Sequence, residues 1–324
     1  MRDSGDTRYL RVSRELFLAA FGARLGGFES WVTDRLVSLL EEDEVRAGEM
    51  LFAAGDAPEF LYFMREGRVL LVRQGGRPRE LDGRHVFGLG DGLLERSRAS
   101  TATAATNLHL MKVRIDAWLE LLDDSFELAR ASILELASDV ARLEERLAAS
   151  ESARSRVPTR GPVLGSVRVP GGHLNVIERM ALLMEVPLLR GGGVQALSDL
   201  AVASQEVSFE RGAPLFDRGI QRDRIYVVLE GEIEASRAAP DLVRTAGPGE
   251  IVCGAAAFGE PAGAWTARGK KTGRALAFRV EDWFDLMEEH FDMVRSALAA
   301  LSATRENLLL ELDEESPAQP GPTG

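Results

Sequence analysis

Cysteine is almost absent from this 324-residue chain. The single one, Cys253, cannot form a disulfide within the chain, and no CxxC motif or cluster of cysteines and histidines offers a metal site. The four histidines are scattered, and none belongs to an HExxH, nucleophile-elbow or P-loop motif. These absences argue against an enzyme, a metal and a cofactor, and they favour a protein of the reducing cytoplasm.

Long apolar runs and an excess of basic residues are missing as well. The chain has no stretch of about 18 apolar residues, which a membrane-spanning helix needs, and its amino terminus lacks the apolar core of a signal peptide. The 51 acidic residues outnumber the 39 basic ones, so the formal net charge is −12. Because nucleic acid is normally bound by a basic surface, we expect neither a nucleic-acid partner nor a membrane span.

What the sequence does contain is an internal repeat. GEMLFAAGDAPEFLYFMREGRV, from Gly48 to Val69, aligns without a gap with GAPLFDRGIQRDRIYVVLEGEI, from Gly212 to Ile233, and seven of the 22 positions are identical. A second match joins DAWLELLDDSFELARAS, which begins at Asp116, to EDWFDLMEEHFDMVRSA, which begins at Glu281. One structural unit is therefore used twice.

Each copy begins and ends with helical patterns and has short, glycine-punctuated alternations between them. In the first copy the leading helical pattern covers 16–42. Between the copies, 152–172 is rich in Gly, Pro, Ser and Arg, as flexible connectors are. We predict an α+β chain of two tandem antiparallel β rolls flanked by helices, with long helices after each roll. The expected divisions are a first domain 1–151, a linker 152–172, a second domain 173–315 and a disordered tail 316–324.

The helix after each roll carries an apolar seam with three-four spacing. In the first copy the seam is Ile133, Leu136, Val140, Leu143 and Leu147, and in the second it is Val294, Leu298, Leu301, Leu308 and Leu312, with Arg305 interrupting. Each helix could fold back on its own roll, or it could pair with a second copy of the chain, with Arg142, Glu144, Glu145 and Arg146 flanking the seam. The sequence leaves both arrangements open.

The motif GxxLFxxGxxxxxLYxxxxGxV, followed by Phe-Gly, an Arg-Ala-Ser-Thr stretch and a Trp-bearing helix, resembles the cyclic-nucleotide-binding domain. The tandem order is similar to the regulatory subunit of cyclic-AMP-dependent protein kinase and to bacterial two-domain proteins, over roughly 40–150 and 185–315. The resemblance implies a small antiparallel roll. It places Gly48, Gly55 and Gly67 at the turns and Phe52, Leu61, Tyr62 and Val69 as inward-facing residues.

The resemblance also implies a phosphate-binding cassette, in which a short helix and an Arg face the cyclic phosphate and a Glu accepts from the ribose. In the first cassette segment, Val86 to Ala104, Gly88 aligns with the family's glycine and Arg98 falls at the arginine position. Ala99, Ser100 and Thr101 follow. Leu89 occupies the Glu position, and Asp91 is a possible substitute. The alternative is that Arg98 is a surface residue paired with Glu95 or Asp91.

The second cassette segment, Val252 to Lys271, has lost both polar groups. Aligning Cys253-Gly254 with Phe87-Gly88 puts Ala255 at the Glu position and Ala264 at the Arg position. Arg268, Lys270 and Lys271 follow later and are interpreted as a solvated strand edge. Glu250 and Glu260 are out of register. We expect this copy not to bind a cyclic nucleotide.

These patterns favour a non-enzymatic regulatory or scaffolding protein that acts through protein contacts, with little or no nucleotide binding. The alternative is a cyclic-nucleotide sensor that binds its ligand in the first copy through Arg98. A transcription factor is disfavoured because an acidic tail follows the last helix, and RYLRVSREL lacks the paired arginines of a kinase-inhibiting segment. The expected partners are proteins that the sequence does not identify, or a second copy of the chain bound through the carboxy-terminal helices.

Overall fold

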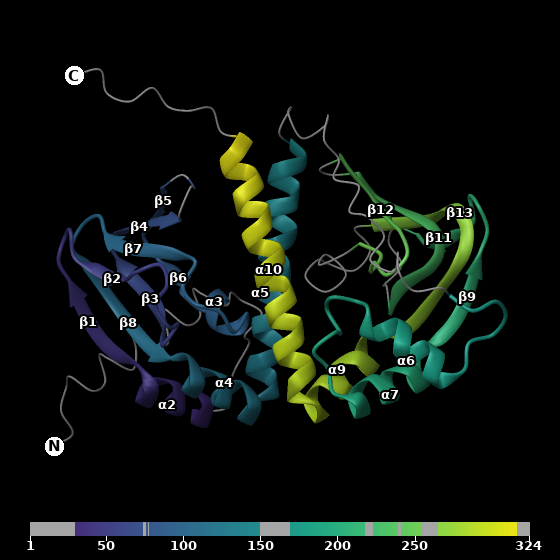
Figure 1. Ribbon diagram of the computed structural model, residues 1–324, viewed down its shortest axis with the longest axis horizontal. Coiled ribbons are helices and arrows are strands. Elements are labelled where there is room, and N and C mark those ends of the chain that lie inside the picture. Colours follow the sequence, from purple (N-terminus) through teal and green to yellow (C-terminus); the bar gives the residue numbers. More distant parts are fainter. Residues whose placement is uncertain are drawn as a thin grey trace. The chain divides into compact units, whose positions relative to one another are not determined.

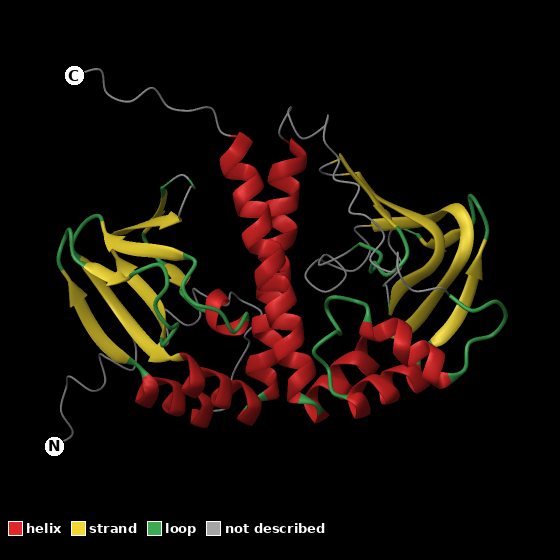
Figure 2. Ribbon diagram, viewed as in Figure 1, coloured by secondary structure: helices red, strands yellow, loops and turns green. Residues whose placement is uncertain are grey.

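The computed structural model describes residues 30–73, 76, 78–149, 169–217, 223–238, 241–253 and 265–315. The chain divides into two compact units, Met1–Glu135 and Leu136–Gly324. Each unit contains an antiparallel β roll with helices (Figure 2), so the predicted α+β architecture is confirmed. The predicted linker up to residue 168 and the tail 316–324 lie outside the described residues, and the predicted domain limits stay a prediction.

The first roll consists of two sheets that face each other (Figure 1). One has the strand order β1 (Glu41–Val45), β8 (Leu108–Arg114), β3 (Phe60–Glu66), β6 (His85–Phe87). The other has the order β2 (Met50–Phe52), β7 (Ser100–Ala104), β4 (Arg68–Arg73), β5 (Arg79–Asp82). The helices of this part of the chain are α2 (Ser30–Leu39), α3 (Gly90–Leu93), α4 (Ile115–Asp124) and the beginning of α5 (Phe126–Ala149).

The corner between β3 and β4 shows why the repeat keeps a glycine there. Gly67 has φ +104°, and a Cβ at this position would lie 2.5 Å from the Asn107 carbonyl oxygen. Gly231 of the second copy has φ +81°, and its Cβ would lie 2.5 Å from the Thr272 carbonyl oxygen. Any other residue would be strained in both places, because both the backbone angle and the close strand exclude a side chain.

The inner face of the first roll is apolar. Its buried cluster consists of Tyr62, Met64, Val69, Leu81, Phe87, Ala102, Ala104, Leu108 and Leu110, and Phe52 packs against it. Three of the predicted inward-facing residues therefore line the interior. Leu61 is fully buried but is not part of this cluster, because side chains alternate along a strand and it points to the opposite face of β3 from Tyr62.

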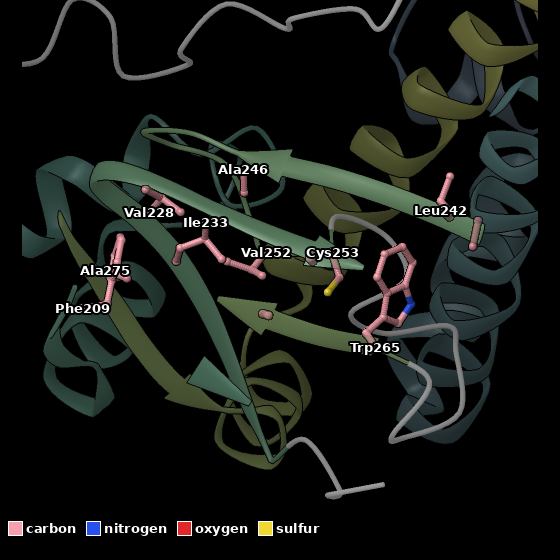
Figure 3. Close-up of a cluster of buried hydrophobic side chains, with 12 residues drawn as sticks. Phe209, Val228, Ile233, Leu242, Ala246, Val252, Cys253, Trp265 and Ala275 are labelled. Atoms are coloured by element: carbon pink, nitrogen blue, oxygen red, sulfur yellow. The ribbon is translucent and has the colours of Figure 1, made fainter. Parts of the chain in front are cut away.

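The second roll has a five-stranded sheet with the order β10 (Pro214–Phe216), β13 (Trp265–Arg279), β11 (Arg224–Ala238), β12 (Asp241–Ala246), and β9 (Gln205–Phe209) pairs with β13. The helices here are α6 (Val176–Met184), α7 (Val194–Ala203), α9 (Val280–Glu289) and α10 (Phe291–Glu315). The buried cluster includes Val228, Ile233, Trp265 and, from α5, Ala141 (Figure 3). From Leu136 onward, α5 packs as part of this second unit.

The helical pattern predicted over 16–42 extends too far. In the described residues the helix ends at Leu39, and Glu41 and Glu42 begin β1, which pairs with β8. Lys112 of β8 lies 2.9 Å from an Asp43 carboxylate oxygen and 3.9 Å from one of Glu41. Acidic residues on this edge strand thus have a basic partner on the neighbouring strand, a cross-strand contact that overrides helix propensity.

The seam of α5 is covered by the chain itself. Ile133, Val140 and Leu143 are buried, and Leu136 and Leu147 are half-buried. Arg305 of α10, the residue that interrupts the second seam, donates through Nε to an Asp139 carboxylate oxygen of α5. The end of α5 therefore packs on α10 and on the second roll, an arrangement that neither sequence hypothesis named. Pairing of the seam with a second copy stays a prediction.

Candidate functional site

Arg98 is the most deeply buried cation of the predicted first site. Its exposed fraction is 3%, and it lies two residues before β7, whose Ala102 and Ala104 belong to the buried cluster. The guanidinium donates to the Phe60 carbonyl oxygen at 2.6 Å and to the Gly88 carbonyl oxygen. Its carbon lies 4.3 Å from the centre of the Phe52 ring. The side chain thus lies along the aromatic inner wall of the first roll.

Among the residues that the structure describes, this guanidinium has no acidic partner. Within the described part of the chain, no carboxylate lies within 4.0 Å of Arg98, and its buried Nε has no hydrogen-bond partner. Burial lowers the pKa of Arg98, while Tyr62, Asp91 and Asp56 act in the opposite direction from a distance. An arginine nevertheless stays charged at neutral pH, because the ordinary pKa of a guanidinium lies far above neutral. The alternative interpretation of Arg98 as a surface residue paired with Glu95 or Asp91 is therefore wrong.

Asp91 is engaged inside the first cassette segment. Its carboxylate lies 2.9 Å from Nε of Arg96 and accepts from the Ala99 amide at 3.4 Å. The helix that carries it, α3, has only four residues and follows Leu89 directly. Gly90 and Gly92 lie within it, and each glycine costs a helix about 1 kcal/mol relative to alanine, so this sequence favours a short helix.

The structure brings together some of the predicted site residues and separates others. Gly88 contacts Arg98, and Asp91 contacts Ala99. Gly88 has φ +91°, and a Cβ there would lie 3.3 Å from an Arg98 nitrogen, so the glycine leaves room for the guanidinium. Ser100 is on the same face of β7 as the inward-facing Ala102. Thr101 has the opposite parity, and its hydroxyl oxygen accepts from the Ala54 amide at 3.0 Å.

The Phe52 ring beside the Arg98 guanidinium belongs to a group of packed aromatic rings. The ring centres of Tyr62 and Phe87 are 5.2 Å apart and stacked, and those of Phe52 and Tyr62 are 5.7 Å apart. Burial raises the pKa of the Tyr62 hydroxyl, although Arg98 and Lys112 oppose the shift. One buried cation against an apolar, aromatic wall is an arrangement suited to an anion that carries a planar group.

The second roll has a pair of arginines that the motif alignment missed. Arg237 of β11 and Arg244 of β12 lie 5.5 and 4.9 Å from the centre of the Trp265 ring. Their side chains are 9% and 17% exposed. Because side chains alternate along a strand, both arginines are on the same face of their strands as apolar residues of the buried cluster. An arginine on the inner face of a predicted strand was the signal available in the sequence.

Two adjacent glutamates of α5 form ion pairs with these arginines. Glu144 lies 2.6 Å from a guanidinium nitrogen of Arg244, and Glu145 accepts from Arg237. Arg244 also donates to the Cys253 carbonyl oxygen at 2.7 Å. Figure 3 shows Cys253 and the Trp265 ring close together within the buried cluster. These groups form a charged cluster at the start of the second cassette segment.

The other predictions for the second cassette have mixed outcomes. Ala255, Ala264 and Glu260 lie outside the described residues. Arg268, Lys270 and Lys271 are exposed on β13, as expected of solvated residues, and each has an acidic neighbour: Asp217, Glu234 and Glu232, respectively. They do not form a strand edge, because β13 lies between β10 and β11 in the sheet. Glu250 accepts from the Gly247 amide at 2.8 Å.

Two further features bear on function. Within the described ranges, no helix combines the length and hydropathy needed to cross a membrane. The same residues contain no group of three or more metal-ligating side chains placed to share an ion.

The model of the cyclic nucleotide-binding domain family matches residues 42–125 and 206–290, which together make up more than half of the chain. Both matches fall on the rolls and on the helices that follow them. No curated protein matches the chain.

Solved structures with a similar fold include protein kinase A regulatory proteins. The regulatory domain of Toxoplasma gondii protein kinase A with cAMP is 17% identical, with a TM-score of 0.32, and covers 89% of this chain and 94% of its own. A variant regulatory subunit of a cAMP-independent protein kinase A from Trypanosoma brucei, bound to cAMP, is 15% identical, with a TM-score of 0.35, over 92% and 90%. The Trypanosoma cruzi counterpart bound to guanosine is 12% identical, with a TM-score of 0.34, over 88% and 85%.

Proposed function

Because the chain belongs to the cyclic nucleotide-binding domain family, we propose that it is a non-catalytic regulatory protein whose first roll takes an anionic ligand through Arg98. The ligand class is a cyclic nucleotide or a closely related phosphate that carries a planar ring. The helices that follow the rolls would report occupancy to a protein partner.

The observation that carries this proposal is the state of Arg98. Its guanidinium is buried, lacks a carboxylate within 4.0 Å among the described residues, and has one orphaned donor. Burying a cation without a counter-ion costs several kcal/mol, whereas hydrogen bonds to carbonyl oxygens offset only part of this cost. A bound phosphate would supply the missing charge next to the aromatic rings of Phe52 and Tyr62.

The same site lacks a group for a ribose hydroxyl. Leu89 cannot accept a hydrogen bond, and the Asp91 carboxylate already contacts Arg96 and Ala99. Loss of one hydrogen bond of this kind costs about 1.5 to 3 kcal/mol, or roughly a tenfold to hundredfold loss of affinity. We therefore expect weak binding, with dissociation constants well above those of a site that holds both groups.

A second candidate is a regulator that works through protein contacts and binds little or no nucleotide. It is favoured by the hydrogen bonds through which Arg98 already engages Phe60 and Gly88, since a ligand would have to replace them. In that case the helices α5 and α10 would be the working surfaces, for a partner protein or for a second copy of the chain.

Thermal melting with millimolar cyclic AMP, cyclic GMP or inorganic phosphate separates the two candidates. Native-state binding at one hundred times the dissociation constant contributes about 2.7 kcal/mol and raises the midpoint by several degrees. The proposal predicts a rise that Arg98→Gln abolishes. Arg68→Gln, which alters an exposed arginine of the same roll that pairs with Glu80, is the matched control and keeps the rise. Absence of any rise, or a rise that survives Arg98→Gln, would contradict ligand binding through Arg98.

A further inference from the structure

Arg244 of the second roll lies at a position comparable to that of Arg98 in the first, although it comes from a different strand. Arg98 donates to the Gly88 carbonyl oxygen, and Arg244 donates to that of Cys253, which the repeat aligns with Phe87, the residue before Gly88. Each guanidinium also lies against an aromatic ring, 4.3 Å from the centre of Phe52 and 4.9 Å from that of Trp265. The second roll thus places a cation at the start of its cassette segment without an arginine at the aligned position.

Arg237 adds a second cation to this place. It lies on β11, directly opposite Trp265 of β13 in the strand register, and its guanidinium is 5.5 Å from the centre of the indole ring. Two guanidinium groups at one indole form a site of two positive charges with an apolar, planar surface. Planar guanidinium groups bind carboxylate and phosphate oxygens through the same pairs of parallel hydrogen bonds.

We propose that Arg237, Arg244 and Trp265 form a phosphate-binding site in the second roll, and that Glu144 and Glu145 of α5 occupy it as built-in carboxylates. The site takes a phosphate group, and Trp265 provides a stacking surface for a ring attached to it. Glu144 meets Arg244 at 2.6 Å, and Glu145 meets Arg237. A phosphate therefore enters only when this acidic pair leaves.

The burial of the cluster supports a recognition role. The side chains of Glu144 and Glu145 are 20% and 28% exposed, and the arginine side chains are less exposed still. Ion pairs removed from water gain little net stability over apolar residues of the same volume. The neighbours of these arginines on the same faces of β11 and β12 are apolar: Ala235, Leu242 and Ala246. Two charge pairs retained in such a place point to a specific anion contact.

The two glutamates that occupy the site belong to α5, the helix that follows the first roll. Ala141, one turn before Glu144 and Glu145, is 2% exposed and is part of the buried cluster of the second roll. Asp139, two residues before Ala141 on α5, accepts a hydrogen bond from Arg305 of α10. Removal of the two glutamate charges would therefore remove the ion pairs with Arg237 and Arg244. Ala141 and the contact with α10 would keep α5 packed in place.

The test uses the full chain with Arg98→Gln as background, so that the first roll does not contribute and a failure here says nothing about the function proposed above. Inorganic phosphate and cyclic AMP are titrated by calorimetry into this background and into Glu144→Gln/Glu145→Gln on it. We expect weak binding from the background, and saturable binding that is at least tenfold tighter from the double variant. Addition of Arg244→Gln should abolish that binding.

A matched control is Glu232→Gln/Glu234→Gln, which removes two exposed carboxylates of the same roll that face Lys271 and Lys270. It should leave the weak binding of the background unchanged. Binding gained equally by this control would indicate a general charge effect and overturn the site. So would a folded Glu144→Gln/Glu145→Gln variant that binds neither probe, or binding that survives Arg244→Gln.

A second measurement does not depend on the double variant and tests the proposal even if that variant fails to fold. Hydrogen exchange of residues 136–149 is followed in the unmodified chain in phosphate and in chloride of equal ionic strength. Phosphate competing for the arginines should speed exchange of this segment at least twofold over chloride. Equal exchange in the two salts would contradict the proposal.

Discussion

The two rolls have the same frame but neutralise their inner cations differently. Strand β11 of the second roll runs through the positions of β3 and β4 of the first, and β13 runs through those of β7 and β8. In the first roll the inner cation, Arg98, donates hydrogen bonds to carbonyl oxygens and has no carboxylate within 4.0 Å among the described residues. In the second, Arg237 and Arg244 meet two glutamates of the same chain. The comparison teaches that two copies of one fold can place an inner cation against carbonyl oxygens in one copy and against carboxylates in the other.

A second pair of equivalent positions shows the same contrast. His109 stands opposite Glu66 in the first roll, and Arg274 stands opposite Glu230 in the second. His109 is half-exposed beside Glu44. All the N–H donors of the Arg274 guanidinium form hydrogen bonds. They donate to the Glu230 and Glu206 carboxylates and to the carbonyl oxygens of Pro170 and Gly172. The second roll therefore uses this position to fasten the chain segment that enters it.

Substitution of the aromatic residue in the charged cluster should have the largest effect. Trp265→Ala removes a side chain that is 3% exposed and leaves a cavity beside two arginines, so we expect a loss of about 3 to 5 kcal/mol in the free energy of unfolding. Ser100→Ala at the equivalent register position of the first roll should cost less than about 1 kcal/mol. Urea unfolding measures the free energy of unfolding of both variants. Equal losses would contradict the expected difference between the interiors of the two rolls.

Removal of the Arg274 contacts should have the next largest effect. Arg274→Met leaves Glu206, whose side chain is 7% exposed, without its cation, and we expect a loss of about 2 to 4 kcal/mol, less than for a fully buried pair. His109→Ala, the matched change in the first roll, should cost about 0 to 1 kcal/mol because its contact with Glu44 is exposed. Chemical denaturation of both variants is the measurement. A larger loss from His109→Ala would reverse the comparison.

The same cluster makes the second roll sensitive to acid. Burial alone would raise the pKa of the Glu206 carboxyl, but the Leu174 amide and Arg274 outweigh it, so the pKa lies below its ordinary value. A carboxyl with a lowered pKa stabilises the fold above its unfolded pKa of about 4.3, and this stability is lost as the pH falls through the folded value. Unfolding followed from pH 7 to pH 3 should show this loss, and Glu206→Gln should flatten it. An unchanged pH profile in Glu206→Gln would contradict this origin.

Exposed ion pairs should have the smallest effect, and here the rolls should agree. Arg268 pairs with Asp217 in the second roll, and Arg68 pairs with Glu80 in the first, with side chains between 45% and 54% exposed. Neutralising either arginine to glutamine should change the free energy of unfolding by about 0 to 1 kcal/mol, because water and salt screen such pairs. Thermal melts of the two variants should nearly coincide. A loss of several kcal/mol in either would show that exposure is a poor guide to these charges.

Much of the frame could be predicted from the sequence because its signals are local. The paired glycines Gly67 and Gly231 mark a corner that only glycine can occupy, and the spacing from Gly88 locates Arg98. The end of α2 was misplaced because Glu41 and Glu42 read as helix formers, while their strand depends on β8, some seventy positions later.

The charged cluster of the second roll could not be predicted by alignment. Arg237 and Arg244 lie on strands outside the cassette motif, and their partners Glu144 and Glu145 are about a hundred positions earlier in the chain. Sequence spacing carries no information about a contact of that kind, since only tertiary packing brings α5 to the second roll. The same glutamates looked like the flank of a helix seam.

The most direct test of the account is hydrogen exchange of the unmodified chain with saturating cyclic AMP. We predict protection of the first cassette segment, 86–104, none in 242–253 of the second roll, and loss of the protection in Arg98→Gln. Protection of 242–253 without any change to Glu144 and Glu145, or no protection in either roll, would contradict the division of roles between them.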